Sequence, residues 1–204
     1  MKKNLLFLLS LLTIISLQTF GQTALQWAQR YNGPVNGTDR ISDADFDPVT
    51  GNTYVTGVSD STTGFNYVTI KYSSAGQVIW RKRYNGPKYQ DSPNAIRYDP
   101  VNNAVYVTGK SKGTTTNFDW LTIRYNANTG GIVWTKTYNG TQNGNDEAID
   151  LDIDASGNIY VLGNVLEACA AHLTTNLIKY TPTGTVVWTK SIYNANQGLK
   201  IRKM

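Results

Sequence analysis

The chain has little cysteine, little histidine and little charge. Its 204 residues include one Cys and one His, and charged residues make up 16% of them, below the roughly 25% of an average globular protein. A single cysteine excludes an intramolecular disulfide framework, and one Cys with one His excludes a Cys/His zinc site. The low charge disfavours long charged helices and acidic disordered tails. The 18 glycines and 13 tyrosines are instead typical of strands joined by tight turns.

The longest apolar run of the sequence lies at the N-terminus. Leu5–Leu17 follows Lys2 and Lys3, and a short polar stretch then leads to Gly21. A basic start, an apolar run and a small residue at the cut predict a secretory signal peptide. A membrane anchor is the alternative, but the run is short of the roughly 20 residues needed to span. We expect residues 1–21 to be removed and 22–204 to be exported to the periplasm, cell surface or medium, without a membrane span.

Four tryptophans at nearly constant spacing mark an internal repeat. They lie 53, 54 and 54 residues apart and are Trp27, Trp80, Trp134 and Trp188. The first three begin the related segments WAQRYNG, WRKRYNG and WTKTYNG, and the fourth begins a degraded WTKSIYN. Between them recur a YVTG-like segment and a TIKY-like segment with alternating apolar residues. Because each unit holds four short strand patterns separated by turn residues, the repeat predicts all-β, propeller-type blades of four antiparallel strands.

The number of complete units is three, with blades expected at about 41–84, 95–138 and 149–193. A lone outer strand is expected at 27–31, and the sequence departs from the repeat after Tyr193, where a fourth unit would begin. Closed propellers typically have about four to eight blades. We therefore expect a partial or open propeller, with three alternatives. The chain is a truncated piece of a longer propeller, two copies close one ring as a homodimer, or a stable open arc exists.

The repeated segments resemble the SBBP-type β-propeller repeat of secreted bacterial proteins. The resemblance extends from Trp27 to about Trp188 and implies the propeller-type fold, but it implies no reaction. A weaker similarity concerns quinoprotein-type propellers, which dock their blades through a tryptophan hairpin. It rests on the GxxxW spacings at residues 76–80, 130–134 and 184–188.

Acidic pairs on the predicted innermost strands are the candidate metal ligands. Alternate residues of a strand share a face, which places Asp43 beside Asp45 and Asp150 beside Asp152. Ca²⁺ takes several oxygen ligands, so these carboxylates are candidates for a calcium site. The second unit has Arg97 at this place, which opposes a cation. The alternative is that the aspartates form hydrogen bonds and turns, and no cofactor is then needed.

Three aromatic residues near the start of the third strands are candidate binding residues. Phe118, Trp120 and the corresponding Tyr67 follow the loop between the second and third strands. Exposed rings at this place would stack on a sugar or a protein. The alternative is that they pack against the next blade.

Two further groups of polar residues are of the types that catalysis uses. The segment Leu166–Thr175 interrupts the third unit and contains Glu167, Cys169 and His172, which suggests a nucleophile and its base, but no adjacent Asn or Asp orients the histidine. One aspartate opens every unit, and we expect it to bind backbone N–H groups at the turn between blades. These are Asp39, Asp91 and Asp146. No residue is assigned a catalytic role.

The positive charges are spread along the repeats, as expected for strand edges that avoid pairing with other chains, and nucleic-acid binding needs a concentrated basic face instead. We therefore expect a secreted, non-catalytic module that binds an unidentified protein or glycan, or has a structural role, at the cell envelope. The competing interpretation is a fragment of a larger propeller enzyme, such as a lyase, hydrolase or quinoprotein-type dehydrogenase.

Overall fold

A computed structural model describes residues 25–166, 173–192 and 200–201. Within them, twelve strands form three antiparallel four-stranded sheets, and each sheet follows chain order from its first strand to its fourth. The strands are β1 Asp39–Phe46, β2 Thr53–Ser59, β3 Asn66–Tyr72, β4 Val78–Tyr84, β5 Asp91–Asp99, β6 Ala104–Lys112, β7 Phe118–Asn126, β8 Ile132–Tyr138, β9 Glu147–Ile153, β10 Ile159–Leu166, β11 Leu173–Tyr180 and β12 Val186–Ile192.

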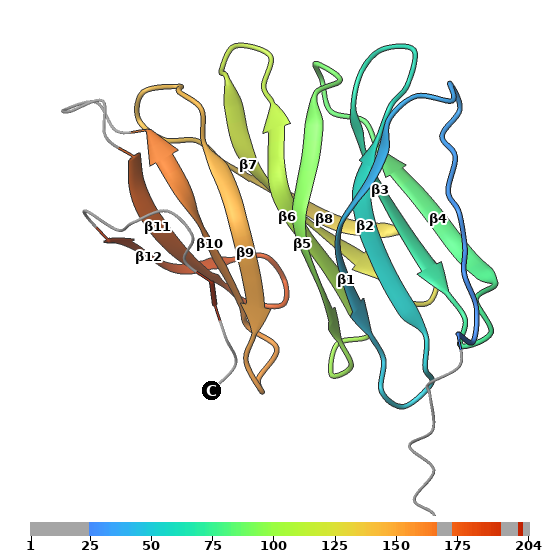
Figure 1. The fold of residues 1–204 in the computed structure, drawn as a ribbon. Coiled ribbons are helices and arrows are strands. Elements are labelled where there is room, and N and C mark those ends of the chain that lie inside the picture. Colours follow the sequence, from blue (N-terminus) through green and yellow to red (C-terminus); the bar gives the residue numbers. More distant parts are fainter. Residues whose placement is uncertain (1–24, 167–172, 193–199, 202–204) are drawn as a thin grey trace, which may run out of the picture.

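The three sheets stand side by side as blades, with β1, β5 and β9 adjacent on one side (Figure 1). We call β1–β4 blade 1, β5–β8 blade 2 and β9–β12 blade 3. Blade 2 contacts both of its neighbours, and the arc is open rather than closed. The all-β, propeller-type fold is thus confirmed. Residues 25–33, which include the lone outer strand predicted at 27–31, run beside blade 1 but belong to none of the three sheets, and residues 34–38 then lead into β1.

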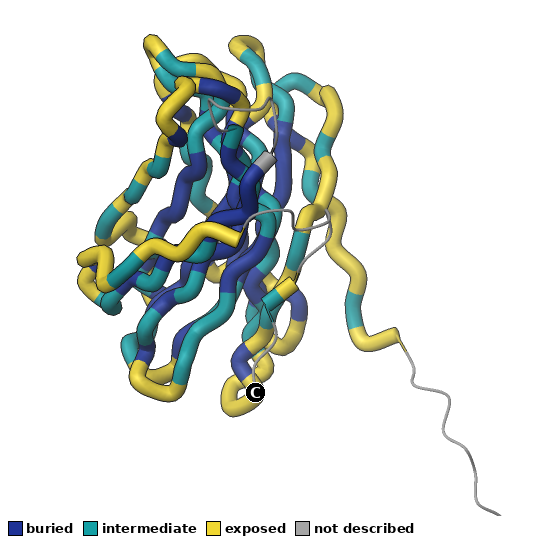
Figure 2. The backbone as a smooth tube through the Cα atoms, turned by 90° about the vertical axis from the view of Figure 1, so that its left-hand side faces the viewer, coloured by how far each residue is buried: buried dark blue, intermediate teal, exposed yellow. Residues whose placement is uncertain are grey.

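Two apolar cores lie between the blades, and Figure 2 shows the buried residues gathered in the middle of the blades. Between blades 1 and 2, Tyr54 and Trp80 pack against a face that includes Ile123 and Tyr125. Between blades 2 and 3, the equivalent residues repeat the arrangement. Because each aromatic side chain buries about 150–250 Å², these two cores are the main source of stability.

The repeated tryptophans connect each blade to the next. The Trp80 ring lies 6.2 Å from the Tyr125 ring of blade 2, and its Nε1 donates to the Ala127 carbonyl oxygen at 3.0 Å. Trp134 repeats both contacts on blade 3, with Tyr180 at 6.3 Å and the Pro182 carbonyl at 3.1 Å. The constant spacing of tryptophan in the sequence therefore reflects a constant contact between blades.

The glycine of each YVTG-like segment allows the first two strands of a blade to approach closely. The pairing of these strands shifts register beside Gly57, Gly109 and Gly163. A Cβ atom added to Gly109 would meet the carbonyl oxygen of Ser92 on β5, and one added to Gly57 would meet the Arg40 carbonyl on β1. Glycine is needed here because the backbone of the bulged partner strand occupies the side-chain space.

Candidate functional site

Acidic residues on the innermost strand of blade 1 bind the edge of the neighbouring strand. One Asp43 carboxylate oxygen accepts the Ile96 N–H at 3.0 Å, and one of Asp45 accepts the Tyr98 N–H at 2.7 Å. The donors lie at alternate positions of β5, as the acceptors lie at alternate positions of β1. This pair of aspartates therefore joins β1 to β5, across the boundary between blades.

Arg97 lies between the acidic residues of blades 1 and 3. Its guanidinium donates to Asp43 at 2.7 Å and to Asp150 at 3.3 Å. Asp150 also accepts the Ile201 N–H at 3.0 Å, whereas Asp152 accepts the N–H of the next residue, Ile153, at 2.8 Å. The structure thus places a cation between two of the four predicted calcium ligands.

The described residues contain no group of three or more His, Cys, Asp and Glu side chains that would hold a metal ion. A Ca²⁺ ion at the predicted place would compete with the Arg97 guanidinium for Asp43 and Asp150. The calcium site stays a prediction, and the hydrogen-bonding alternative accounts for the observed partners of all four aspartates.

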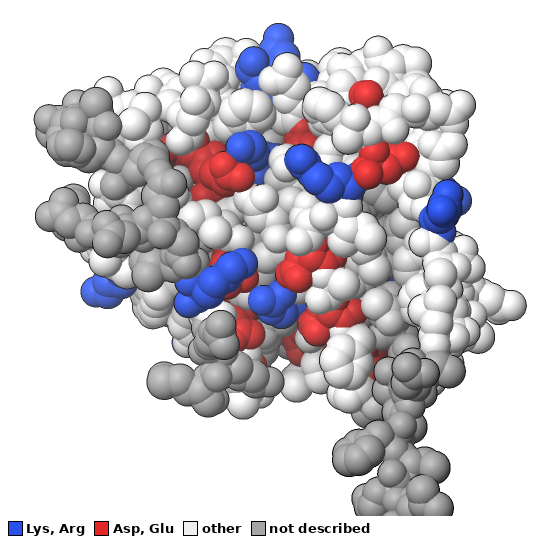
Figure 3. Space-filling model, viewed as in Figure 1, with Lys and Arg blue, Asp and Glu red and all other residues white. Residues whose placement is uncertain are grey.

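A second polar group joins the innermost strands of blades 2 and 3. Glu147 accepts a hydrogen bond from the Lys110 ammonium at 2.8 Å and one from the Asn94 amide at 2.8 Å. Asn94 also donates to the Ala148 carbonyl. Figure 3 shows that positive and negative side chains alternate over this face instead of separating into two fields.

The aspartate that opens each blade accepts the N–H of the glycine in the preceding Tyr-Asn-Gly turn. The distances from the glycine nitrogen are 2.7 Å for Asp39, 2.7 Å for Asp91 and 2.5 Å for Asp146. Asp91 also accepts the Ser111 hydroxyl at 2.5 Å. Burial raises the pKa of Asp91, although the hydrogen bonds from Ser111 and Gly86 act in the opposite direction. The predicted structural role of the three aspartates is confirmed.

Two of the three predicted binding aromatics lie inside the blade interfaces. Tyr67 is 0% exposed and Trp120 is 1% exposed. The Trp120 Nε1 donates to the Asn164 carbonyl oxygen of blade 3 at 2.8 Å, and its ring lies 5.2 Å from that of Tyr138. Neither ring offers a face to a ligand, because each is needed to fill a core. The prediction of stacking is therefore corrected for these two, and their packing alternative holds.

Phe118 alone of the three is accessible, and it borders a groove of about 560 Å³ between blades 1 and 2. Phe65, which is 43% exposed, lies in the same groove with Arg40 and Lys110. The ammonium of Lys110 lies 5.2 Å from the centre of the Phe118 ring, and that of Lys112 lies 5.9 Å from it. The lining of the groove thus combines two aromatic rings with the cations Arg40 and Lys110, and Lys112 lies beside the Phe118 ring.

Sequence reasoning overlooked Phe65. A usable signal was present, because Phe65-Asn-Tyr and Phe118-Asp-Trp occupy the same place in their repeats. What the sequence does not reveal is that the loop ends of two consecutive blades meet in one groove. That requires the stacking of the blades.

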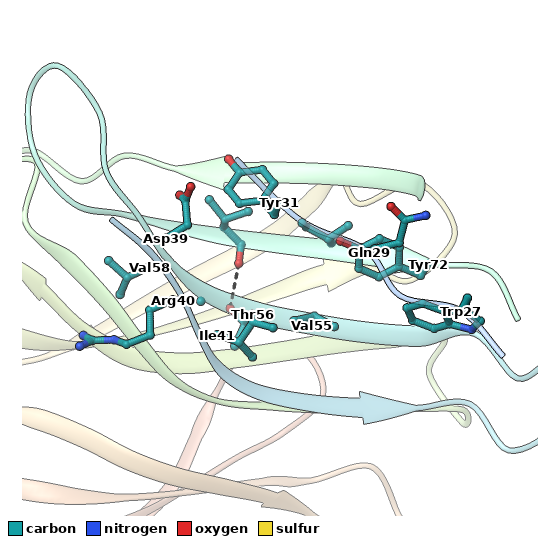
Figure 4. Close-up of a pocket in the computed structure, with 13 residues that line it drawn as sticks. Trp27, Gln29, Tyr31, Asp39, Arg40, Ile41, Val55, Thr56, Val58 and Tyr72 are labelled. Carbon is teal, nitrogen blue, oxygen red and sulfur yellow. Dashed lines mark hydrogen bonds between the residues drawn. The ribbon is translucent and has the colours of Figure 1, made fainter. Parts of the chain in front are cut away.

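A second groove, of about 330 Å³, lies on the face of blade 1 that points away from blade 2. Figure 4 shows it between the extended segment at Trp27 to Tyr31 and the strands of blade 1. Its floor is apolar and includes Val55, Val68 and Ile70. This is the face on which a preceding blade would lie.

Some predictions fall outside the described residues: the signal peptide at 1–21, and Glu167, Cys169 and His172 of the interrupted third unit. Among the described residues, no helix is long and apolar enough to cross a membrane.

Residues 79–119, from β4 to the start of β7, match the family model described as SBBP, a β-propeller repeat. This confirms the resemblance for that stretch. No curated protein matches the sequence.

Two solved structures are similar at 10% identity. One is described as a crystal structure of the eukaryotic initiation factor, with a TM-score of 0.48 over 80% of this chain and 35% of that one. The other is a tail fiber of Staphylococcus aureus phage P68, with a TM-score of 0.28 over 76% of this chain and 39% of that one. The chain thus spans well under half the length of either structure.

Proposed function

We propose that the chain is an exported, non-catalytic binding module of the cell envelope and that its partner is an acidic glycan. The observation that carries the proposal is the groove between blades 1 and 2, where Phe65 and Phe118 line the same surface as Arg40 and Lys110, and Lys112 lies beside Phe118. Loops and strand ends held by a rigid scaffold are the usual place for recognition. The polar residues of the neighbouring inner strands bind one another, which supports a role in positioning rather than in a reaction.

The charges of the groove favour an anionic partner. Lys110 is paired with Glu147, whereas Arg40 and Lys112 form no salt bridge with another described residue. Arg40 is exposed and Lys112 is half-buried. Two unpaired cations beside aromatic rings suit a chain of sugar rings that carry carboxylates, because rings stack and carboxylates accept charge-assisted hydrogen bonds.

The backbone of the groove favours a glycan over an extended polypeptide. The Phe65 carbonyl accepts the Asp91 N–H at 2.9 Å, and the Gln90 carbonyl accepts the Lys112 N–H at 3.0 Å. A peptide that adds to a sheet needs an unpaired strand edge. The first bond joins blade 1 to blade 2 and the second lies within blade 2. Since these backbone groups are already paired, the groove presents side chains to a ligand and not a strand edge.

We expect the chain beginning at Gln22 to bind polygalacturonate and to lose that binding as salt is raised. Lys112→Ala should raise the dissociation constant roughly tenfold, because a charged hydrogen bond contributes about 1.5–3 kcal/mol. Phe118→Ala should raise it about three- to tenfold through lost stacking. Isothermal titration calorimetry at two salt concentrations measures both effects.

The matched control is Lys190→Ala, which removes an exposed lysine from β12, far along the chain from the groove. It should leave the affinity unchanged. Neutral dextran should not bind. Equal affinity for polyglutamate would identify an acidic polypeptide as the partner class, and no effect of Lys112→Ala or Phe118→Ala would contradict the site.

A further inference from the structure

Trp27 occupies the place of an outer-strand tryptophan, although the part of the chain that the structure describes has no blade before blade 1. Its ring lies 5.7 Å from the Tyr72 ring at an interplanar angle of 33°. The two blade interfaces show nearly the same geometry, 6.2 Å and 31° for Trp80 with Tyr125, and 6.3 Å and 37° for Trp134 with Tyr180. Trp27 therefore packs on blade 1 in the same way as the tryptophan of a preceding blade would.

The turn beneath each tryptophan repeats as well. Gly76 lies against the Trp27 ring, as Gly130 lies against the Trp80 ring and Gly184 against that of Trp134. Each of the three glycines has a positive φ, of 78°, 67° and 81°. The receiving turn of blade 1 thus has the same form as the receiving turns of blades 2 and 3.

Tyr31 fixes the other end of this segment to blade 1. Its hydroxyl accepts hydrogen bonds from Arg83 at 3.1 Å and from Ser59 at 3.4 Å, and the Arg81 guanidinium lies 5.4 Å from its ring. The corresponding Tyr84 instead packs on Tyr67 of its own blade, at 6.0 Å. Segment 27–31 is therefore held at both ends in the position of a fourth strand.

The rest of this face is uncovered. Ile41 is 72% exposed, whereas Ala148, at the same place in blade 3, is 0% exposed. Val55 is only half-buried, whereas the corresponding Val107 and Val161 are fully buried. The exposed apolar residues border the groove that Figure 4 shows. Blade 1 thus receives the tryptophan of a preceding blade, but not the side chains that the first three strands of such a blade would supply.

The interface between blades 1 and 2 shows what those strands would contribute. There, Tyr54 comes from the second strand and Lys71 from the third, whose ammonium donates to the Ala127 carbonyl at 3.0 Å. We propose that a three-stranded antiparallel unit of this same repeat docks on the open face of blade 1 and takes segment 27–31 as its fourth strand.

The inner edge of β1 has two N–H groups that such a unit could bind. The N–H groups of Ala44 and Phe46 correspond to those of Ile96 and Tyr98, which bind the aspartates of the preceding strand. On β1 they donate to their own neighbours, Asp43 and Asp45, at 2.9 Å each. An inner strand with carboxylates at alternate positions would accept these two N–H groups.

A second copy of this chain does not supply the unit. Its blade 3 carries its own fourth strand, β12, with Trp188 in the docking position. That tryptophan would need the place on Tyr72 that Trp27 already occupies. Segment 27–31 thus excludes a complete blade from this face and admits one that lacks its outer strand.

The test adds three strands directly before segment 27–31. A chain is prepared in which residues 39–77, which hold β1 to β3 and the following turn, are joined to residue 25 of the chain. We expect a monomer in which amide exchange at residues 28–31 slows at least about tenfold, as newly paired strands require. The thermal unfolding midpoint should rise, and Trp27→Ala should lower it more than in the chain without the addition.

A second extended chain carries residues 91–131, from β5 to the turn after β7, in place of residues 39–77. It keeps the test decisive if the first added segment does not fold. The control addition is residues 39–84, which brings its own fourth strand and should protect residues 28–31 much less. Unchanged exchange at 28–31 with both three-stranded additions would overturn the proposal, and so would equal protection by the four-stranded one. Polygalacturonate binding tests the proposed function separately, because Phe65, Lys110 and Phe118 line only the groove between blades 1 and 2, although Arg40 borders both grooves.

Discussion

Replacing Trp120 by alanine is expected to lower the free energy of unfolding by roughly 3–5 kcal/mol, the usual cost of removing a large aromatic side chain from a core. Trp120 is 1% exposed and packs between blades 2 and 3. Its loss also leaves the Asn164 carbonyl, which accepts the indole N–H at 2.8 Å, without that partner. The effect should be large because one side chain joins two blades.

Urea unfolding followed by circular dichroism measures this change, with Trp134→Ala as the matched control. Trp134 is only half-buried and lies nearer the outer edge of the same interface. We expect it to cost about 2 kcal/mol, in proportion to the smaller area it buries. Equal effects of the two substitutions would contradict the account of the interface, since burial is then not what distinguishes them.

Replacing Asp146 by alanine is expected to cost roughly 2–5 kcal/mol, because each buried N–H that loses its partner costs about 1–3 kcal/mol. Asp146 is fully buried and accepts two backbone N–H groups, from Gly140 at 2.5 Å and from Leu166 at 2.9 Å. No water reaches these donors easily once the carboxylate is gone. The turn that leads from blade 2 to blade 3 would loosen first.

Asp39→Ala is the control for this substitution, because the same motif position is half-exposed in blade 1. Asp39 accepts the Gly33 N–H at 2.7 Å, and water replaces that bond more readily at an open blade face. We expect a loss below about 1 kcal/mol, the net value of an ordinary hydrogen bond. A larger loss for Asp39→Ala than for Asp146→Ala, in the same urea titration, would contradict this explanation.

The blades could be predicted from the sequence because their signals are local. The tryptophan spacing and the alternation in segments such as Val68–Tyr72 fix the number and order of the strands. The first strand of each blade begins two to four residues before the predicted start of that blade, at Asp39, Asp91 and Glu147. The recurring aspartate at the start of each blade was correctly assigned to the turn, since a residue present in every unit serves the geometry of every unit.

The candidate site was less predictable because it depends on contacts between blades. Tyr67 and Trp120 look like exposed loop aromatics in the sequence, but stacking of the next blade buries them. Arg97 breaks the acidic pattern of its repeat, and only the fold shows that it bridges Asp43 and Asp150. Residues that depart from a repeat are where sequence patterns say least, because no neighbouring unit provides a comparison.

Amide hydrogen exchange on the chain beginning at Gln22 tests most directly the central claim that each blade is stabilised by the faces of its neighbours. Blade 2 is covered on both sides, whereas one side of blade 1 has only segment 27–31 against it. The slowest exchange is therefore expected in β6 and β7, with faster exchange in β1 and β12, because local opening follows the number of buried contacts. Exchange in β6 and β7 as fast as in β1 would contradict the account.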